Sequence, residues 1–80
     1  MIRIGIVDDH AIVRSGLRQF LSEHVDLRVV GEAANGREAI DLVRAHEIDV
    51  LLMDLSMPGQ SGIDALAMLR AKAPDMGILI

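Results

Sequence analysis

The chain lacks cysteine, tryptophan and tyrosine, and Phe20 is the single aromatic residue among its 80 residues. The absence of cysteine excludes disulfides, thiolate metal sites and thiol nucleophiles, and it fits a reducing compartment. Because one aromatic ring cannot fill an interior, the core must be built from Ile, Leu, Val, Ala and Met. That composition is typical of an α/β protein rather than an all-β one.

Basic residues are few and scattered. Eight Lys and Arg stand against 12 Asp and Glu, the net charge is −4, and Lys72 is the only lysine. Because no basic cluster can replace the counterions of a phosphate backbone, we expect no direct nucleic acid contact by this segment. No apolar run approaches the length of a membrane span, and the N-terminal apolar stretch meets Asp8 too soon for a signal peptide. We therefore expect a cytoplasmic protein without membrane contact.

Strand-like and helix-like segments alternate along the chain. Short apolar runs predict four strands, at 2–7, 27–33, 50–53 and 77–80. Helical spacing of apolar residues predicts three helices between them, the first from about 11 to 22–24, the second from the Asn35-Gly36 turn to about 46, and the third from about 61 to Pro74. Right-handed crossovers turn this alternation into a parallel sheet covered by helices.

The apolar pattern also predicts burial. The uninterrupted run 50–53 indicates a strand buried on both faces and central in the sheet, whereas Arg28 and Glu32 place the strand at 27–33 nearer an edge. One stripe of the first helix is expected to face the sheet: Val13, Leu17, Phe20 and Leu21.

Acidic side chains follow two of the predicted strands. Asp8 and Asp9 come directly after the first strand, and Asp54 follows the third. Ligands of open parallel sheets gather at the carboxyl ends of strands, where the winding direction reverses, so these three carboxylates should meet. Burying them costs free energy unless a cation compensates the charge, and oxygen donors suit Mg²⁺. The sequence therefore predicts a Mg²⁺ site.

Each of these residues also has an ordinary interpretation. Asp8, Asp9 or His10 could serve at the N-cap of the first helix, an interaction worth about 1 kcal/mol, and Asp54 could be a solvated turn residue. The histidines at 10, 24 and 46 match no ligand spacing, so a histidine metal site is not expected, and His10 is placed at the mouth of the acidic pocket. Only the combination of Asp8, Asp9 and Asp54 favours a functional role.

Three stretches carry a resemblance to a known family: Ile6-Val7-Asp8-Asp9-His10, Val13-Arg14-x-Gly16-Leu17 and Glu32-Ala33-x-Asn35-Gly36-x-Glu38-Ala39. Across all 80 residues the chain resembles the receiver domain of bacterial two-component response regulators, in the NarL/FixJ subfamily. The resemblance implies a flavodoxin-like (CheY-like) sheet with helices on both faces. Residues 1–80 would form a partial, C-terminally truncated domain, with about four strands and three helices of a five-strand, five-helix fold and no second domain.

The resemblance also implies the roles of individual residues. Asp54 would be the phosphoacceptor, and Asp8, Asp9, Asp54 and the backbone carbonyl of Ser56 would hold Mg²⁺. The partner would be a sensor histidine kinase that docks near the first helix, beside Arg14 and Arg18. Phosphorylation would control a DNA-binding helix-turn-helix domain that the printed chain does not contain. The segment itself would not be an enzyme.

The family pattern is incomplete here. The Ser or Thr that ends the family's fourth strand and the Lys that ends its fifth have no counterpart, and Lys72 lies too early to replace that lysine. We therefore expect a segment without full switching ability. We also expect it to form a homodimer or larger oligomer through its exposed fourth strand.

Three alternatives remain to be weighed. The first is a degenerate or truncated receiver that acts only as an oligomerisation or interaction module. Haloacid dehalogenase-like phosphotransferases fit less well, because Ser56 stands where they place a second acid. A nucleotide-binding domain is disfavoured, because no G-x-G-x-x-G motif or P-loop lysine follows the first strand.

Overall fold

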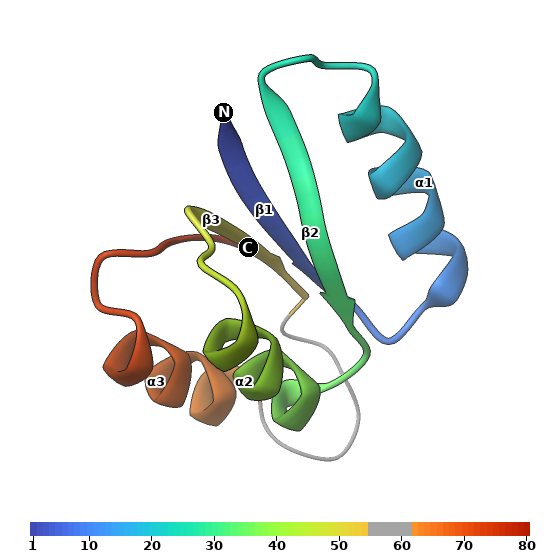
Figure 1. The fold of residues 1–80 in the computed structure, drawn as a ribbon. Helices are drawn as coiled ribbons and strands as arrows, with labels where there is room; N and C mark the ends of the chain where they lie inside the picture. The colour runs from blue at the N-terminus through green and yellow to red at the C-terminus, as the bar shows by residue number, and fades with distance from the viewer. Residues whose placement is uncertain (55–61) are drawn as a thin grey trace.

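The computed structural model describes residues 1–54 and 62–80. Ser56, the expected carbonyl ligand of Mg²⁺, lies outside the described residues, as does the type II turn that the Pro58-Gly59 pair predicts. The elements follow in the order β1 (Ile2–Val7), α1 (Ala11–Ser22), β2 (Leu27–Ala33), α2 (Gly36–Ala45), β3 (Val50–Met53), α3 (Gly62–Lys72) and β4 (Gly77–Leu79) (Figure 1). The predicted alternation of strands and helices is confirmed.

The four strands form one parallel sheet in the order β2-β1-β3-β4. Helix α1 covers one face, and α2 and α3 cover the other (Figure 1). The first crossover leads from β1 to one side, and the next returns past β1 to β3, so the winding reverses between β1 and β3. The carboxyl ends of these two strands are therefore the expected place for a site.

The predicted positions of β2 and β3 are confirmed, since β2 is an edge strand and β3 lies between β1 and β4. Burial of β3 on both faces is confirmed only in part. Leu51 and Met53 are buried, whereas Val50 and Leu52 on the opposite face are half-buried. The reason is that α2 and α3 cover the first face, while α1 on the second face contacts β1 and β2 and leaves β3 less covered.

The larger core lies between the sheet and the helices α2 and α3. Its fully buried members include Leu51 on β3 and Leu69 on α3. Glycine allows α2 to approach the sheet closely, because a Cβ atom added to Gly31 would lie 2.4 Å from Cδ1 of Leu42. Any side chain at position 31 would therefore push Leu42 out of its place.

The start of α2 corrects one detail of the sequence interpretation. Asn35-Gly36 was expected to form a turn before the helix, but Asn35 is the N-cap and Gly36 is the first helical residue. The Asn35 side chain accepts a hydrogen bond from the Glu38 N–H at 2.9 Å, and the Glu38 carboxylate accepts one from the Ala34 N–H at 2.9 Å. This reciprocal pattern resembles a capping box and fixes the chain directly after β2.

The predicted stripe of α1 is only half correct. Leu21 is buried and Leu17 is half-buried against Ile4 and Ile6 of β1. Val13 and Phe20 were expected to face the sheet, but they are 42% and 59% exposed. Helical spacing shows which side of a helix is apolar, whereas burial also depends on how much surface the neighbouring elements cover.

Among the residues that the structure describes, no helix is long and apolar enough to cross a membrane.

Candidate functional site

The backbone of β1 and β3 brings Asp8 and Asp54 together. Val7 and Met53 are partners in the parallel register, and one step further the Asp54 N–H donates to the Val7 carbonyl at 2.9 Å. On the other side, the Asp8 N–H donates to the carbonyl of Ala33 at 3.0 Å. Both aspartates are thus held by ladder-type hydrogen bonds just beyond their strands.

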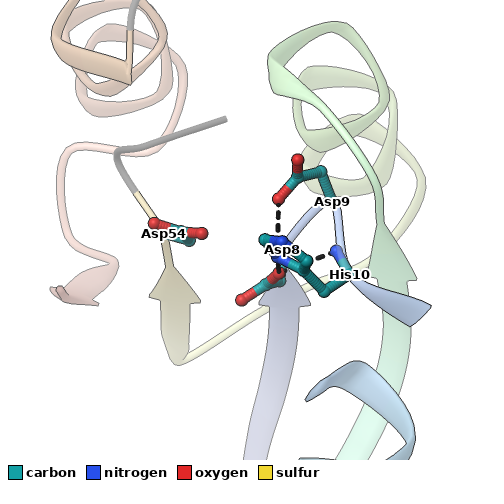
Figure 2. A group of neighbouring side chains, drawn as sticks. All are labelled: Asp8, Asp9, His10 and Asp54. Carbon is teal, nitrogen blue, oxygen red and sulfur yellow. Dashed lines mark hydrogen bonds and ion pairs between the residues drawn. The ribbon is translucent and has the colours of Figure 1, made fainter. Parts of the chain in front are cut away.

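Four side chains form one cluster at this edge of the sheet. Asp8, Asp9, His10 and Asp54 each offer one ligand atom, and these atoms lie within 4.8 Å of one another. Figure 2 shows Asp54 at the end of β3, beside the other three residues at the end of β1. The sequence-predicted trio of carboxylates is therefore close enough to share one cation, whereas Ser56 lies outside the described residues.

Asp8 is the most deeply placed member, at 8% exposure. Its Oδ1 atom accepts a hydrogen bond from the His10 N–H at 2.8 Å and lies 2.9 Å from His10 Nδ1. His10 itself is the N-cap of α1, but its side chain makes no capping hydrogen bond. Neither Asp9 nor His10 caps the helix with its side chain, so the capping interpretation of these two residues is wrong. Both side chains belong to the cluster with Asp8 and Asp54 instead.

Asp9 provides the clearest sign that the cluster suits a metal cation. Its Oδ1 atom is buried and accepts no hydrogen bond. His10 Nδ1 lies 2.9 Å away, near enough for an ion pair but without hydrogen-bond geometry. A buried carboxylate oxygen without a donor is costly, so this atom fits a cation ligand. The donor set of carboxylate oxygens suits a hard divalent ion such as Mg²⁺.

His10 supplies positive charge to the cluster. Its pKa is raised because its ring hydrogen-bonds to Asp8 and lies near the negative charges of Asp9 and Asp54. A raised pKa in the folded state means that this interaction stabilises the fold below the ordinary histidine pKa and is lost as the pH rises through the raised one. Sequence reasoning placed His10 at the pocket mouth but left it out of the donor set. Its ring nitrogen in fact lies among the carboxylates.

Comparison with known proteins shows the family to which this chain belongs. The family model "Response regulator receiver domain" matches residues 4–80. The chain belongs to this family. The receiver domain is 40% identical to response regulator UvrY of Escherichia coli K12 over 80 residues, which are 100% of this chain and 37% of the relative. It is 43% identical to the nitrate/nitrite response regulator protein NarL of the same strain over 70 residues, covering 88% of this chain and 32% of the relative.

Solved structures share the fold of this receiver domain. The response regulator domain of Thermotoga maritima CheB aligns with a TM-score of 0.90 and 37% identity, over 98% of this chain and 57% of that one. RcsB of Salmonella enterica serovar Typhimurium, bound to the promoter rprA in the presence of the phosphomimetic BeF3−, aligns with a TM-score of 0.89 and 32% identity, over 98% and 66%. The expected CheY-like fold is confirmed, and the chain spans 37% of the length of UvrY.

Proposed function

We propose that the receiver domain accepts a phosphoryl group on the Asp54 carboxylate in a Mg²⁺-dependent reaction. The observation that supports this proposal is the convergence of three carboxylates within 4.8 Å, one of which has a buried oxygen without a hydrogen-bond donor. Asp54 is the favoured acceptor because its position resembles that of the family's phosphoacceptor and because Asp8 is buried, at 8% exposure. Asp54 is half-buried and faces the pair from the neighbouring strand (Figure 2).

The proposed metal ligands are the side chains of Asp8, Asp9 and Asp54, together with the backbone carbonyl of Ser56. When bound, Mg²⁺ would neutralise the carboxylates and reduce their repulsion of an anionic phosphoryl donor. In the transfer, an Asp54 carboxylate oxygen attacks phosphorus in line with the leaving group. The new oxygen–phosphorus bond forms as the bond to the leaving group breaks, and the leaving group keeps the electron pair.

The proposed donor is the phosphorylated histidine of a sensor histidine kinase, whose imidazole nitrogen is the leaving group, and the proposed location of the receiver domain is the cytoplasm. The proposed output is control of a DNA-binding domain in a longer protein, consistent with relatives named as response regulators and with the promoter-bound RcsB structure. This segment would not touch DNA itself, because its net charge is −4. It would be a substrate of the kinase rather than an enzyme acting on other molecules.

Phosphorylation by a small donor tests the proposal. The chain is incubated with acetyl phosphate and Mg²⁺, and its intact mass is measured. We expect a labile gain of one phosphoryl group that disappears in Asp54→Asn and with EDTA. Asp41→Asn is the matched control, because Asp41 is an exposed acid on α2. No mass gain, or a gain that survives Asp54→Asn, would contradict the proposal.

A second candidate function is an interaction module that assembles through β4. The observation that favours it is a pair of exposed apolar side chains at the edge strand β4. Leu79, the last residue of β4, is 62% exposed, and Ile80, which follows it, is 70% exposed. An unpaired edge can pair with a second copy. Sedimentation velocity over a range of concentrations tests this: self-association that Leu79→Lys abolishes supports it, and a concentration-independent monomer argues against it.

A further inference from the structure

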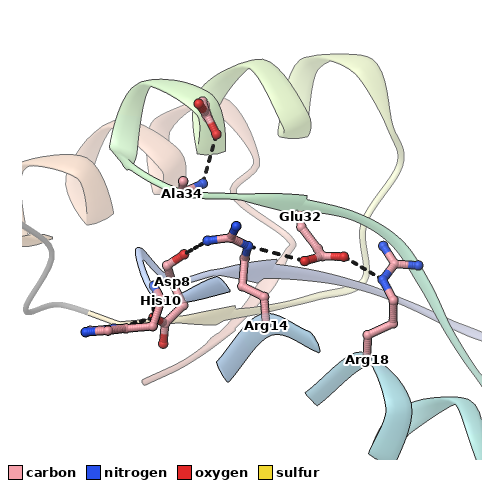
Figure 3. A network of polar contacts seen from close by, with 7 residues as sticks. Asp8, His10, Arg14, Arg18, Glu32 and Ala34 are labelled. Atoms are coloured by element: carbon pink, nitrogen blue, oxygen red, sulfur yellow. Dashed lines mark hydrogen bonds and ion pairs between the residues drawn. The ribbon is translucent and has the colours of Figure 1, made fainter. Parts of the chain in front are cut away.

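Arg14 on α1 reaches the backbone between two of the carboxylates. Its Nη1 atom donates a hydrogen bond to the Asp8 carbonyl oxygen at 2.5 Å, and its Nε atom donates to Oε1 of Glu32 on β2 at 3.3 Å. Arg18, one turn further along α1, donates from Nε to the other carboxylate oxygen of Glu32 at 2.5 Å. Figure 3 shows that the side chains of Arg14, Glu32 and Arg18 follow one another in a row that begins at the Asp8 carbonyl.

The inner part of this network, Arg14 and Glu32, is largely shielded from solvent. The side chains of Arg14 and Glu32 are only 20% and 28% exposed, whereas that of Arg18 is 48% exposed. Glu32 is the register partner of Ile6 in the β1–β2 ladder, so its position is set by the sheet. Glu32 therefore anchors Arg14, and Arg18 supports Glu32 without touching Asp8.

The Asp8 carbonyl belongs to the peptide group that joins Asp8 to Asp9. Because this peptide group is planar, the orientation of its carbonyl fixes the positions of the Asp9 N and Cα atoms, from which the Asp9 side chain extends. Asp8 is held from its N–H by Ala33 and from its side chain by His10. The hydrogen bond from Arg14 fixes the remaining polar group of this residue, and a charged donor makes that bond comparatively strong.

We propose that Arg14 is a positioning residue for the metal site: it holds the Asp8–Asp9 peptide so that both carboxylates face one cation. This inference rests on the proposed Mg²⁺ site. Charge and geometry act in opposite directions here. A positive guanidinium near the site repels Mg²⁺, so loss of the charge alone would tighten binding, whereas loss of positioning weakens it.

The experiment compares Mg²⁺ affinity, by titration of backbone amide NMR signals, with thermal stability in EDTA. Substitution of residues that orient metal ligands costs about 10-fold or more in metal affinity. We expect that Arg14→Gln weakens Mg²⁺ binding about 10-fold. Arg14→Lys, which keeps a donor for the Asp8 carbonyl, should recover part of the loss.

Two controls separate positioning from general stability. Arg18→Gln removes a contact to the same Glu32 but none to Asp8, and Arg3→Gln removes ion pairs at the opposite end of the sheet. Both should lower the melting temperature in EDTA while leaving Mg²⁺ affinity within about 2-fold of the wild type, because neither touches the Asp8 carbonyl. If Arg14→Gln does not fold, Glu32→Gln replaces it and should weaken Mg²⁺ binding through loss of the anchor of Arg14.

Several results would overturn the inference. Unchanged or tighter Mg²⁺ binding by Arg14→Gln would show that charge outweighs positioning, and equal weakening by Arg18→Gln would assign the effect to general stability. Wild-type affinity in Glu32→Gln, where that variant stands in, would also refute it. A wild-type chain that binds no Mg²⁺ would refute the proposed function as well. A wild type that binds Mg²⁺ while Arg14→Gln binds it equally would refute the positioning role alone.

Discussion

Replacing Asp9 by Asn should change stability in opposite directions with and without Mg²⁺. Without the metal, the cluster holds like charges within 4.8 Å of one another. Coulomb's law gives about 0.9 kcal/mol of repulsion per pair at this separation in a water-like dielectric and about 3.5 kcal/mol at an effective dielectric of 20. Asp9 faces two other carboxylates, those of Asp8 and Asp54, so the lower figure alone gives about 2 kcal/mol of repulsion that Asp9→Asn relieves.

His10 must be neutral for this comparison, because its positive ring otherwise attracts Asp9. The measurement is therefore made at a pH above the raised pKa of His10, which an NMR titration of its ring locates. Each kcal/mol shifts the melting temperature of a domain this size by roughly 4–8 °C, so about 2 kcal/mol corresponds to roughly 8–16 °C. Thermal unfolding followed by circular dichroism should thus show Asp9→Asn melting higher than the wild type in EDTA.

Magnesium should reverse the order. At a concentration about a hundredfold above the dissociation constant, Mg²⁺ stabilises the wild type by about 2.7 kcal/mol, which exceeds the repulsion relieved in the variant. Asp9→Asn lacks one carboxylate ligand and should gain little, so the wild type should then melt at the higher temperature. Asp41→Asn, on the exposed side of α2, should follow the wild type in both conditions. A variant that melts lower in EDTA, or that responds to Mg²⁺ like the wild type, would refute the reasoning.

Further predictions concern the scaffold. Gly31→Ala should destabilise the fold by about 1–3 kcal/mol, because the new Cβ atom would lie 2.4 Å from Leu42 Cδ1; in chemical denaturation this cost should shrink in a Leu42→Ala background. Asn35→Ala should cost about 1 kcal/mol through loss of the α2 cap, and an unchanged denaturation midpoint would refute that role. Hydrogen bonds from Arg3 lower the pKa of Asp49 below its ordinary value of 3.8, so the pair stabilises the fold at neutral pH and the benefit is lost as the pH falls through the lowered pKa. Asp49→Asn should therefore melt lower than the wild type at neutral pH and converge with it in acid; a gap that persists in acid would contradict this.

The order of strands and helices could be predicted because local patterns determine it. The apolar run of β3 and the helical spacing of α2 differ in period, and Asp8 and Asp54 mark the ends of their strands. Parallel pairing then leaves both acids at one edge of the sheet. The candidate site followed from strand ends alone, which is why its carboxylates could be named without coordinates.

Other features depend on contacts that the sequence does not encode locally. Val13 and Phe20 belong to the apolar side of α1, but their exposure depends on which surfaces pack against that helix. The contact between Arg14 and the Asp8 carbonyl depends on the angle at which α1 leaves β1. From the sequence, Arg14 was placed only beside the expected docking position of the kinase on the first helix. The buried oxygen of Asp9 could likewise be found only from coordinates.

Paramagnetic broadening by Mn²⁺, used as a substitute for Mg²⁺, tests most directly whether the three carboxylates hold one cation. In an amide NMR spectrum of the chain, substoichiometric Mn²⁺ should first erase the signals of Asp8, Asp9, His10 and Asp54, and excess Mg²⁺ should restore them. The exposed acids Asp41 and Glu47 should be affected only at higher concentration. Broadening that begins at those surface acids, or that Mg²⁺ does not reverse, would contradict a shared metal site at the ends of β1 and β3.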